Sequence, residues 1–87
     1  MLANEARKNS SEVIWNSLPS IIRNNIEGAV NVGKLNCEII FYVDEIDKFY
    51  ECIKYFNNLN ELGYKTSMHK EYDKYTHERK RVITIIW

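Results

Sequence analysis

Histidines and cysteines are the side chains of this chain that most readily support metal binding or nucleophilic catalysis. The chain has two of each: His69, His77, Cys37 and Cys52. Zinc sites are usually marked by closely spaced pairs of such ligands, and no close-spaced pair occurs here. The two histidines flank a polar segment, where a histidine is most often solvated. We therefore expect no metal ion and no cofactor.

The remaining signs of catalysis are equally weak. Cys37 and Cys52 alternate with or adjoin apolar residues, which is typical of small core side chains rather than nucleophiles. No glycine-rich phosphate loop is present, because the three glycines stand where helices are expected to end. Carboxylates at 44, 45 and 47 fit the start of a helix. We expect no catalytic residues and no enzymatic activity.

The segment from Lys70 to Arg81 (KEYDKYTHERKR) is chemically the richest part of the chain. It interleaves tyrosines with basic side chains, a combination that can stack on bases and hold phosphates. The same residue types form hot spots of protein interfaces. The plainer alternative is a charged, solvated hairpin that its own acidic residues neutralise. The candidate binding residues are Lys70, Tyr72, Lys74, Tyr75, His77, Arg79, Lys80 and Arg81.

Charge is balanced overall but uneven along the chain. Twelve basic and twelve acidic residues give a formal charge of zero, so we expect no long nucleic acid as a partner. Residues 34–63 carry a local charge of −3 and residues 64–87 a local charge of +3. Such halves suit charge-complementary self-association or a polar partner. Two ordinary solvated faces explain them equally simply.

Length and composition predict one small domain. The chain has 87 residues, of which 45% are hydrophobic and 28% charged, values typical of a folded globule. The first residues lack the apolar core of a secretory signal, and no apolar run is long enough to cross a bilayer. We expect a cytoplasmic protein without a membrane partner. Chains this short bury little surface, and oligomerisation is a common remedy.

The apolar pattern predicts two parts, an N-terminal helical segment (1–32) and a β-α-β-β unit (34–87). In the first part, apolar residues recur every four positions from Ile14 to Ile26. Pro19 interrupts the pattern, so either Ser17 caps a second helix with Pro19 in its first turn or one helix kinks there. Gly28 weakens the end of this helix, and Gly33 can terminate it.

The second part alternates as strands should. Residues 35–43 (LNCEIIFYV) predict a strand, and a helix follows from Asp44, its expected N-cap, to Gly63. A modest strand is predicted over 64–70, a broad loop over 71–77 and a strand over 81–87. The last strand is apolar on both faces, which favours a central position. The predicted fold is therefore α+β, with a three-stranded mixed sheet whose last strand is central and antiparallel to the other two.

A three-stranded sheet has a second face to bury. The predicted helix after the first strand covers one face, and the N-terminal helix either folds over the same layer or reaches a second subunit. A two-fold partner is the simplest cover for the other face. We therefore expect a homo-oligomer, a dimer or higher. The candidate interface residues are Ile40, Tyr42, Ile83, Ile85 and Trp87.

With these elements placed, the chain resembles small proteins encoded by bacteriophages. The resemblance comes from ANEARK (Ala3–Lys8), from the Leu62-Gly63-Tyr64-Lys65 step and from the closing ITIIW (Ile83–Trp87). It covers most of the length and carries no catalytic residue across. It implies action by stoichiometric binding in the host cytoplasm, as anti-CRISPR proteins block a host defence protein.

Three functions follow as hypotheses. The leading one is a non-enzymatic, phage-type inhibitor of a host defence protein. The second is an oligomeric sponge that sequesters a signalling nucleotide, with Arg79, Lys80 or Arg81 on phosphate and a tyrosine on the base. The third is a structural or assembly subunit that associates through its apolar sheet face.

Overall fold

The computed structural model describes residues 11–87. Residues 11–17 are helical, and seven elements follow: α2 (Ser20–Asn31), β1 (Asn36–Tyr42), the 3₁₀ turn η1 (Val43–Glu45), α3 (Ile46–Ile53), α4 (Phe56–Glu61), β2 (Lys65–Tyr72) and β3 (Arg79–Ile86). The α+β class is as predicted. The first part of the predicted helical segment 1–32, with Ala3–Lys8, lies outside the described residues.

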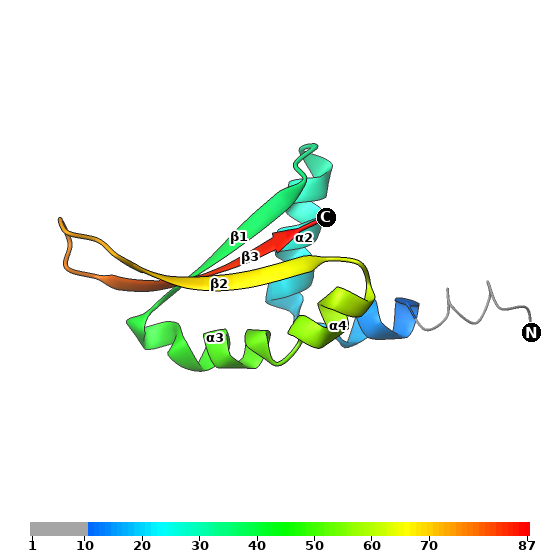
Figure 1. Ribbon diagram of the computed structural model, residues 1–87, viewed down its shortest axis with the longest axis horizontal. Helices are drawn as coiled ribbons and strands as arrows, with labels where there is room; N and C mark the ends of the chain where they lie inside the picture. Colours follow the sequence, from blue (N-terminus) through cyan, green and yellow to red (C-terminus); the bar gives the residue numbers. More distant parts are fainter. Residues whose placement is uncertain (1–10) are drawn as a thin grey trace, which may run out of the picture.

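The sheet has the order β1-β3-β2, so the last strand is central, as its two apolar faces predicted (Figure 1). β3 is antiparallel to both of its neighbours. β1 and β2 are therefore parallel to each other but are not paired. The sheet is therefore antiparallel and not mixed as predicted, because both of its ladders are antiparallel.

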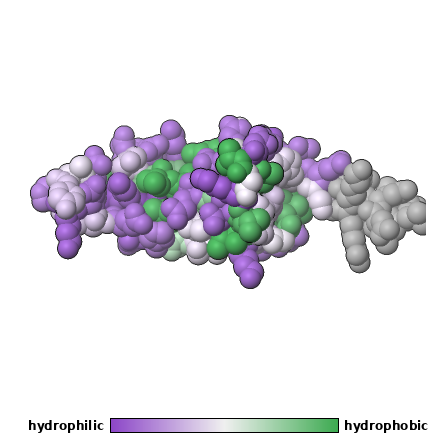
Figure 2. Space-filling view, turned by 90° about the horizontal axis from the view of Figure 1, so that it is seen from above, coloured by the Kyte–Doolittle hydropathy of each residue, from purple (hydrophilic) through white to green (hydrophobic). Residues whose placement is uncertain are grey.

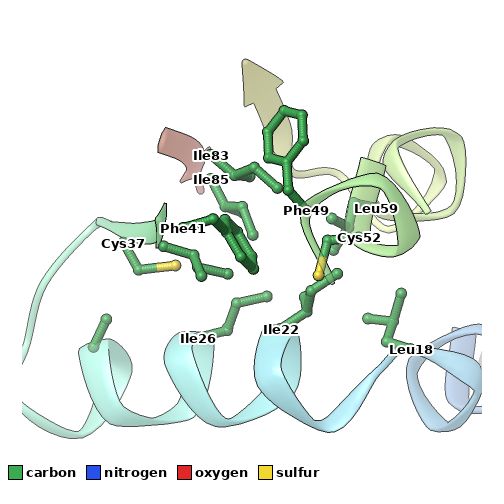
Figure 3. Packing of buried hydrophobic residues seen from close by; sticks show 12 residues of the cluster. Leu18, Ile22, Ile26, Cys37, Phe41, Phe49, Cys52, Leu59, Ile83 and Ile85 are labelled. Carbon is green, nitrogen blue, oxygen red and sulfur yellow. The ribbon is translucent and has the colours of Figure 1, made fainter. Parts of the chain in front are cut away.

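The three named helices contribute to a single hydrophobic core against one face of the sheet (Figure 3). α2 therefore folds over the same layer as α3 and α4 within its own chain. Phe41 and Phe49 meet edge to face in this core, with ring centroids 5.8 Å apart. The buried residues of this core are Leu18, Ile22, Ile26, Ala29, Cys37, Ile39, Phe41, Phe49, Cys52, Leu59, Ile83 and Ile85.

Pro19 separates two helices instead of kinking one. It has extended ψ (φ −57°, ψ 146°), and α2 begins at the next residue. Ser17 does not cap α2, because its hydroxyl donates to the carbonyl of Ile14 (2.6 Å) in the preceding helix. The change of direction lets Leu18 at the junction and Ile22 in α2 enter the same core.

Two of the three glycines end helices as the sequence predicted, whereas Gly28 lies within α2. Gly33 and Gly63 have φ of +76° and +96°, a left-handed conformation that glycine adopts without steric cost. After α4, Gly63 N donates to Asn60 O (3.0 Å) and Tyr64 N to Leu59 O (3.1 Å). This Schellman pattern satisfies the last carbonyls of the helix and starts β2. The same two bonds recur around Gly33, which leads into β1.

The predicted helix from Asp44 to Gly63 is wrong in two details. Asp44 lies inside η1, and Glu45 is the residue that precedes α3. The helix is also broken after Ile53, where Tyr55 N bonds to Cys52 O in a tight i→i−3 turn (3.1 Å). Leu59 of α4 joins Phe49 and Cys52 of α3 in the core.

Candidate functional site

The β2–β3 hairpin extends beyond the end of β1 (Figure 1), and its loop is organised by Asp73. The carboxylate of Asp73 accepts hydrogen bonds from the backbone N–H groups of Tyr75 (2.9 Å) and Thr76 (3.3 Å). These bonds lower the pKa of the Asp73 carboxyl. His77 adopts φ of +57° and pairs with the Tyr72 hydroxyl (2.8 Å). The loop therefore has local order despite lacking glycine and proline.

A hollow of about 610 Å³ lies where the hairpin meets the end of β1 and the start of α3. The hairpin provides one wall, and β1, η1 and α3 provide the other. The lining residues are Phe41, Tyr42, Val43, Ile46, Lys70, Glu71, Tyr72, Arg79, Lys80 and Arg81. We call this hollow the hairpin pocket. Its lining has four cationic side chains against a single carboxylate, so its net charge is positive.

Strand register concentrates positive charge on the helix-side face of the hairpin. Lys70 stands directly opposite Arg81, and Tyr72 stands opposite Arg79. Opposed side chains on antiparallel strands have Cβ atoms about 5 Å apart, and like charges in this arrangement are destabilising. An anion placed between Lys70, Arg79 and Arg81 would relieve this repulsion.

Aromatic rings hold Arg81 in place. Its guanidinium carbon lies 5.3 Å from the Phe49 ring centroid and 5.8 Å from that of Tyr50, distances suited to cation–π attraction. Phe49 is itself buried in the core. Arg81 is thus oriented in advance by α3, which lowers the entropy lost when it binds a ligand.

Lys80 projects toward the opposite side of the sheet. Its ammonium lies 5.6 Å from the Tyr42 ring centroid and 3.9 Å from the Asp73 carboxylate. Among residues 11–87, by contrast, no ion pair is recorded for Lys70, Arg79 or Arg81. These three cations, rather than Lys80, are the ones available to an anionic ligand.

The structure divides the eight candidate residues into two groups. Lys70, Tyr72, Arg79, Lys80 and Arg81 line the hairpin pocket. Lys74, Tyr75 and His77 lie in the loop beyond it, and Tyr75 is 97% exposed. Lys74 and Tyr75 border a second hollow of about 370 Å³, which shares Glu71, Tyr72 and Lys80 with the hairpin pocket. His77 lines neither of these two hollows.

Three apolar residues of the pocket were missing from the sequence prediction. Phe41, Val43 and Ile46 come from the end of β1, η1 and α3. Val43 is 66% exposed although it continues the buried row of the predicted strand. Only the pairing of β1 with β3, which sets Phe41 opposite Arg81, brings these residues to the hairpin.

The predicted oligomer interface does not form one surface. Ile83 and Ile85 have no exposed area and lie in the core, and Trp87 is half-buried against that core. Ile40 and Tyr42 are 44% and 40% exposed on the opposite face. The strand register explains why the prediction was wrong. Ile83 pairs with Ile39, so both side chains lie on the face of the sheet that the helices cover. The row beside Ile40 is instead Val82, Thr84 and Ile86.

The two cysteines are buried in the core, whereas His69 lies on the exposed surface of the sheet. Burial raises the pKa of the Cys37 thiol, and burial together with Glu51 raises the pKa of Cys52 to about 11. Such thiols are poor nucleophiles at neutral pH. His69 contacts Glu71 (2.8 Å) on the exposed sheet surface. Within residues 11–87 no three His, Cys, Asp or Glu side chains are grouped as a metal site requires.

The surface around the hairpin differs from the rest of the molecule. In Figure 2 the hairpin end is largely hydrophilic, whereas hydrophobic side chains gather nearer the centre.

Over the described residues, no helix has the length and apolarity needed to cross a membrane.

Comparisons of the chain with models of protein families, with curated proteins and with solved structures return no match.

Proposed function

We propose that this protein is a non-enzymatic binding protein that sequesters a small phosphate-bearing ligand, such as a nucleotide, in the hairpin pocket. The observation that carries the proposal is the opposition of Lys70 and Arg81, with Arg79 two residues along the same face. Repulsion among these cations makes an anion a favourable occupant.

The remainder of the pocket suits a planar group attached to that anion. Tyr72, which is 55% exposed, contributes aromatic surface on the same face of the hairpin as the three cations. Stacking of a base on such a ring is worth about 1–3 kcal/mol. A volume of about 610 Å³ is also within the range of small-molecule sites. The ligand class supported best is therefore a phosphate joined to an aromatic ring.

Direct titration tests this proposal. Nucleoside mono- and diphosphates and cyclic dinucleotides would be titrated into the protein by calorimetry, with inorganic phosphate and the free nucleoside as reference ligands. We expect binding that weakens as salt rises, because the phosphate contacts are screened. Lys70→Ala and Arg79→Ala should each weaken it about tenfold or more, since charge-assisted hydrogen bonds contribute about 1.5–3 kcal/mol.

Lys65→Ala is the matched control, because Lys65 is an exposed lysine at the other end of the same strand. Equal losses of affinity in Lys65→Ala and Lys70→Ala would mean that the effect comes from the overall positive charge and not from the pocket. Native mass spectrometry before and after denaturation provides a second test, because a ligand retained from the cell appears as a released mass. Unchanged affinity in both pocket variants would overturn the proposal.

The second candidate is the phage-type inhibitor, which a separate observation supports. The loop beyond the pocket projects Tyr75 almost fully into solvent, and tyrosine and arginine are frequent anchors of protein interfaces. On this hypothesis the hairpin tip occludes a surface of a host defence protein without turnover. The resemblance to small phage proteins favours such a partner.

Tyr75→Ala separates the two candidates. Tyr75 lies outside the hairpin pocket, so this variant should bind a nucleotide as the parent protein does. A protein captured from host lysate by the parent chain, and lost by Tyr75→Ala, would support the inhibitor. Capture that depends on Lys70 and Arg79 but not on Tyr75 would contradict a tip-mediated contact.

A further inference from the structure

β1 is an edge strand, and its free hydrogen-bonding groups can be assigned. Trp87 N donates to Leu35 O (3.0 Å), so odd-numbered residues of this strand bond to β3. Antiparallel ladders alternate, which turns the N–H and C=O groups of Asn36, Glu38 and Ile40 away from β3. The contact of Tyr42 N with the Glu45 carboxylate (3.4 Å) agrees with this assignment.

The two edge strands of the sheet differ in the features that prevent pairing with another chain. β2 carries Lys65, His69, Lys70 and Glu71, and charged side chains of this kind deter pairing with other chains. β1 has one charged residue, Glu38, and neither lysine nor proline. Its register with β3 also runs from Asn36 to Tyr42 without a bulge. The β1 edge therefore lacks most of the devices that prevent strand addition.

A groove of about 540 Å³ separates this edge from α2. Gly28 of α2 lines it, and a Cβ atom built there would meet nothing within 4 Å. A glycine inside a helix costs about 1 kcal/mol relative to alanine, and no contact of the described chain requires it. Its lack of a side chain leaves α2 open to close approach by another backbone. Asn24 and Val32, one turn to either side, line the same groove.

We propose that two copies of this chain join through their β1 edges, antiparallel about a two-fold axis at Ile39, to make a six-stranded sheet. This register places Asn36 opposite Tyr42 and Glu38 opposite Ile40 along the whole strand. Because Tyr42 N already donates to Glu45 (3.4 Å), the end pair is joined through the Tyr42 carbonyl. Centring the axis on Glu38 would oppose two carboxylates, and centring it on Ile40 would shorten the pairing. The two α2 helices then lie on one side of the joined sheet, with Gly28 toward the axis.

A second copy fits this site because a two-fold axis brings together the two features that lack a partner, the β1 edge and the groove at Gly28. Each β1 edge supplies the donors and acceptors that the other needs, and each α2 brings the same groove lining to the axis. An extended peptide from another protein would pair with the β1 edge, but it would bring no second α2 helix to pack near Gly28. The interface lies away from Lys70 and Arg79, although its β1 residues Phe41 and Tyr42 also line the hairpin pocket.

Sedimentation equilibrium of the full chain tests the proposal. The parent protein should be a dimer that dissociates on dilution. Ile40→Pro removes an N–H that faces outward, and Gly28→Gln adds a side chain where α2 approaches its partner. Each should weaken dimerisation roughly tenfold or more, or about 1.4 kcal/mol, while the circular dichroism spectrum stays that of the parent.

Met68→Pro is the matched control, because Met68 holds the equivalent outward-facing position on β2. Asp73 N bonds to Glu78 O (2.9 Å), so even-numbered residues of β2 face away from β3, and this variant should remain a dimer. Amide exchange at Glu38 and Ile40 should slow as the parent concentration rises. A parent chain that stays monomeric, or a dimer that survives both Ile40→Pro and Gly28→Gln, would overturn the proposal.

Discussion

The two cysteines illustrate how burial decides the chemistry of a single side chain. Cys37 lies in β1 and Cys52 in α3, and both are in the core. Removing the thiol proton would place a charge among apolar neighbours, so burial raises both pKa values. The sequence prediction that both are small core side chains is confirmed.

Cys52 should therefore make stability depend on alkaline pH. Its pKa is 9.0 unperturbed and about 11 when folded, so the folded state holds the proton more tightly. The stabilisation is complete below pH 9 and is lost as pH rises toward 11. We expect urea unfolding to show a fall in stability across this window, and a smaller fall in Cys52→Ala. An identical pH dependence in the variant would contradict this assignment.

Asp73 acts through its acceptor oxygen rather than its charge alone. We expect Asp73→Ala to speed amide exchange at Tyr75 and Thr76, because both lose their hydrogen-bond acceptor. Asp73→Asn keeps an acceptor and should change exchange little. The lowered pKa of the carboxyl means that loop order is present above its usual value of 3.8 and is lost as pH falls further.

The break between α3 and α4 shows how packing overrides a continuous helical pattern. Buried residues recur at Phe49, Cys52 and Leu59, and ten residues separate the first from the last. An ideal α-helix turns about 100° per residue, which would place Leu59 about 80° from Phe49 and about 20° from Cys52, so the apolar pattern fits one continuous helix as well. Neither glycine nor proline marks this position in the sequence.

Gly63 terminates α4 for a reason that a substitution can test. We expect Gly63→Ala to lower the free energy of unfolding by about 1–2 kcal/mol, because alanine resists the left-handed conformation at φ +96°. Gly28→Ala is the control, since that glycine lies within α2. In dilute protein it should raise stability by up to about 1 kcal/mol. Thermal or urea unfolding gives both values, and losses of equal size would refute the distinction.

The molecule as a whole is a sheet with two unlike faces. The helices cover the face that contains Ile39, Ile83 and Ile85. On the other face Val82 is buried, but Ile40, Tyr42 and Ile86 are each about 40% exposed. An antiparallel sheet tolerates one solvated face. The need to bury the second face, from which the sequence-based interface was inferred, is correspondingly weaker.

Truncation of two isoleucines of β3 tests this asymmetry. Ile83→Ala should cost about 2–5 kcal/mol in the free energy of unfolding, because it leaves a cavity in the core. Ile86→Ala should cost less than about 1 kcal/mol, since its side chain is 42% exposed. Urea denaturation of the two variants measures both. Similar losses would mean that both faces are buried in solution.

Local patterns predicted most of the elements and part of the site. Alternation marked β1, a run of apolar residues marked β3, and two of the three glycines marked helix ends, because these signals depend on neighbours within a few residues. The same holds for the basic residues of the hairpin, which are adjacent in sequence. The double-sided apolarity of the last strand was sufficient to predict its central position.

Pairing between distant residues decided the rest. Both rows of β3 are apolar, so only the register of Ile39 with Ile83 shows which row the helices cover. The same register sets Phe41 beside Arg81 and completes the hairpin pocket from three elements. Such contacts depend on the packing of helices against a sheet, and a one-residue slip would reverse every side chain. No pattern within a single segment contains that information.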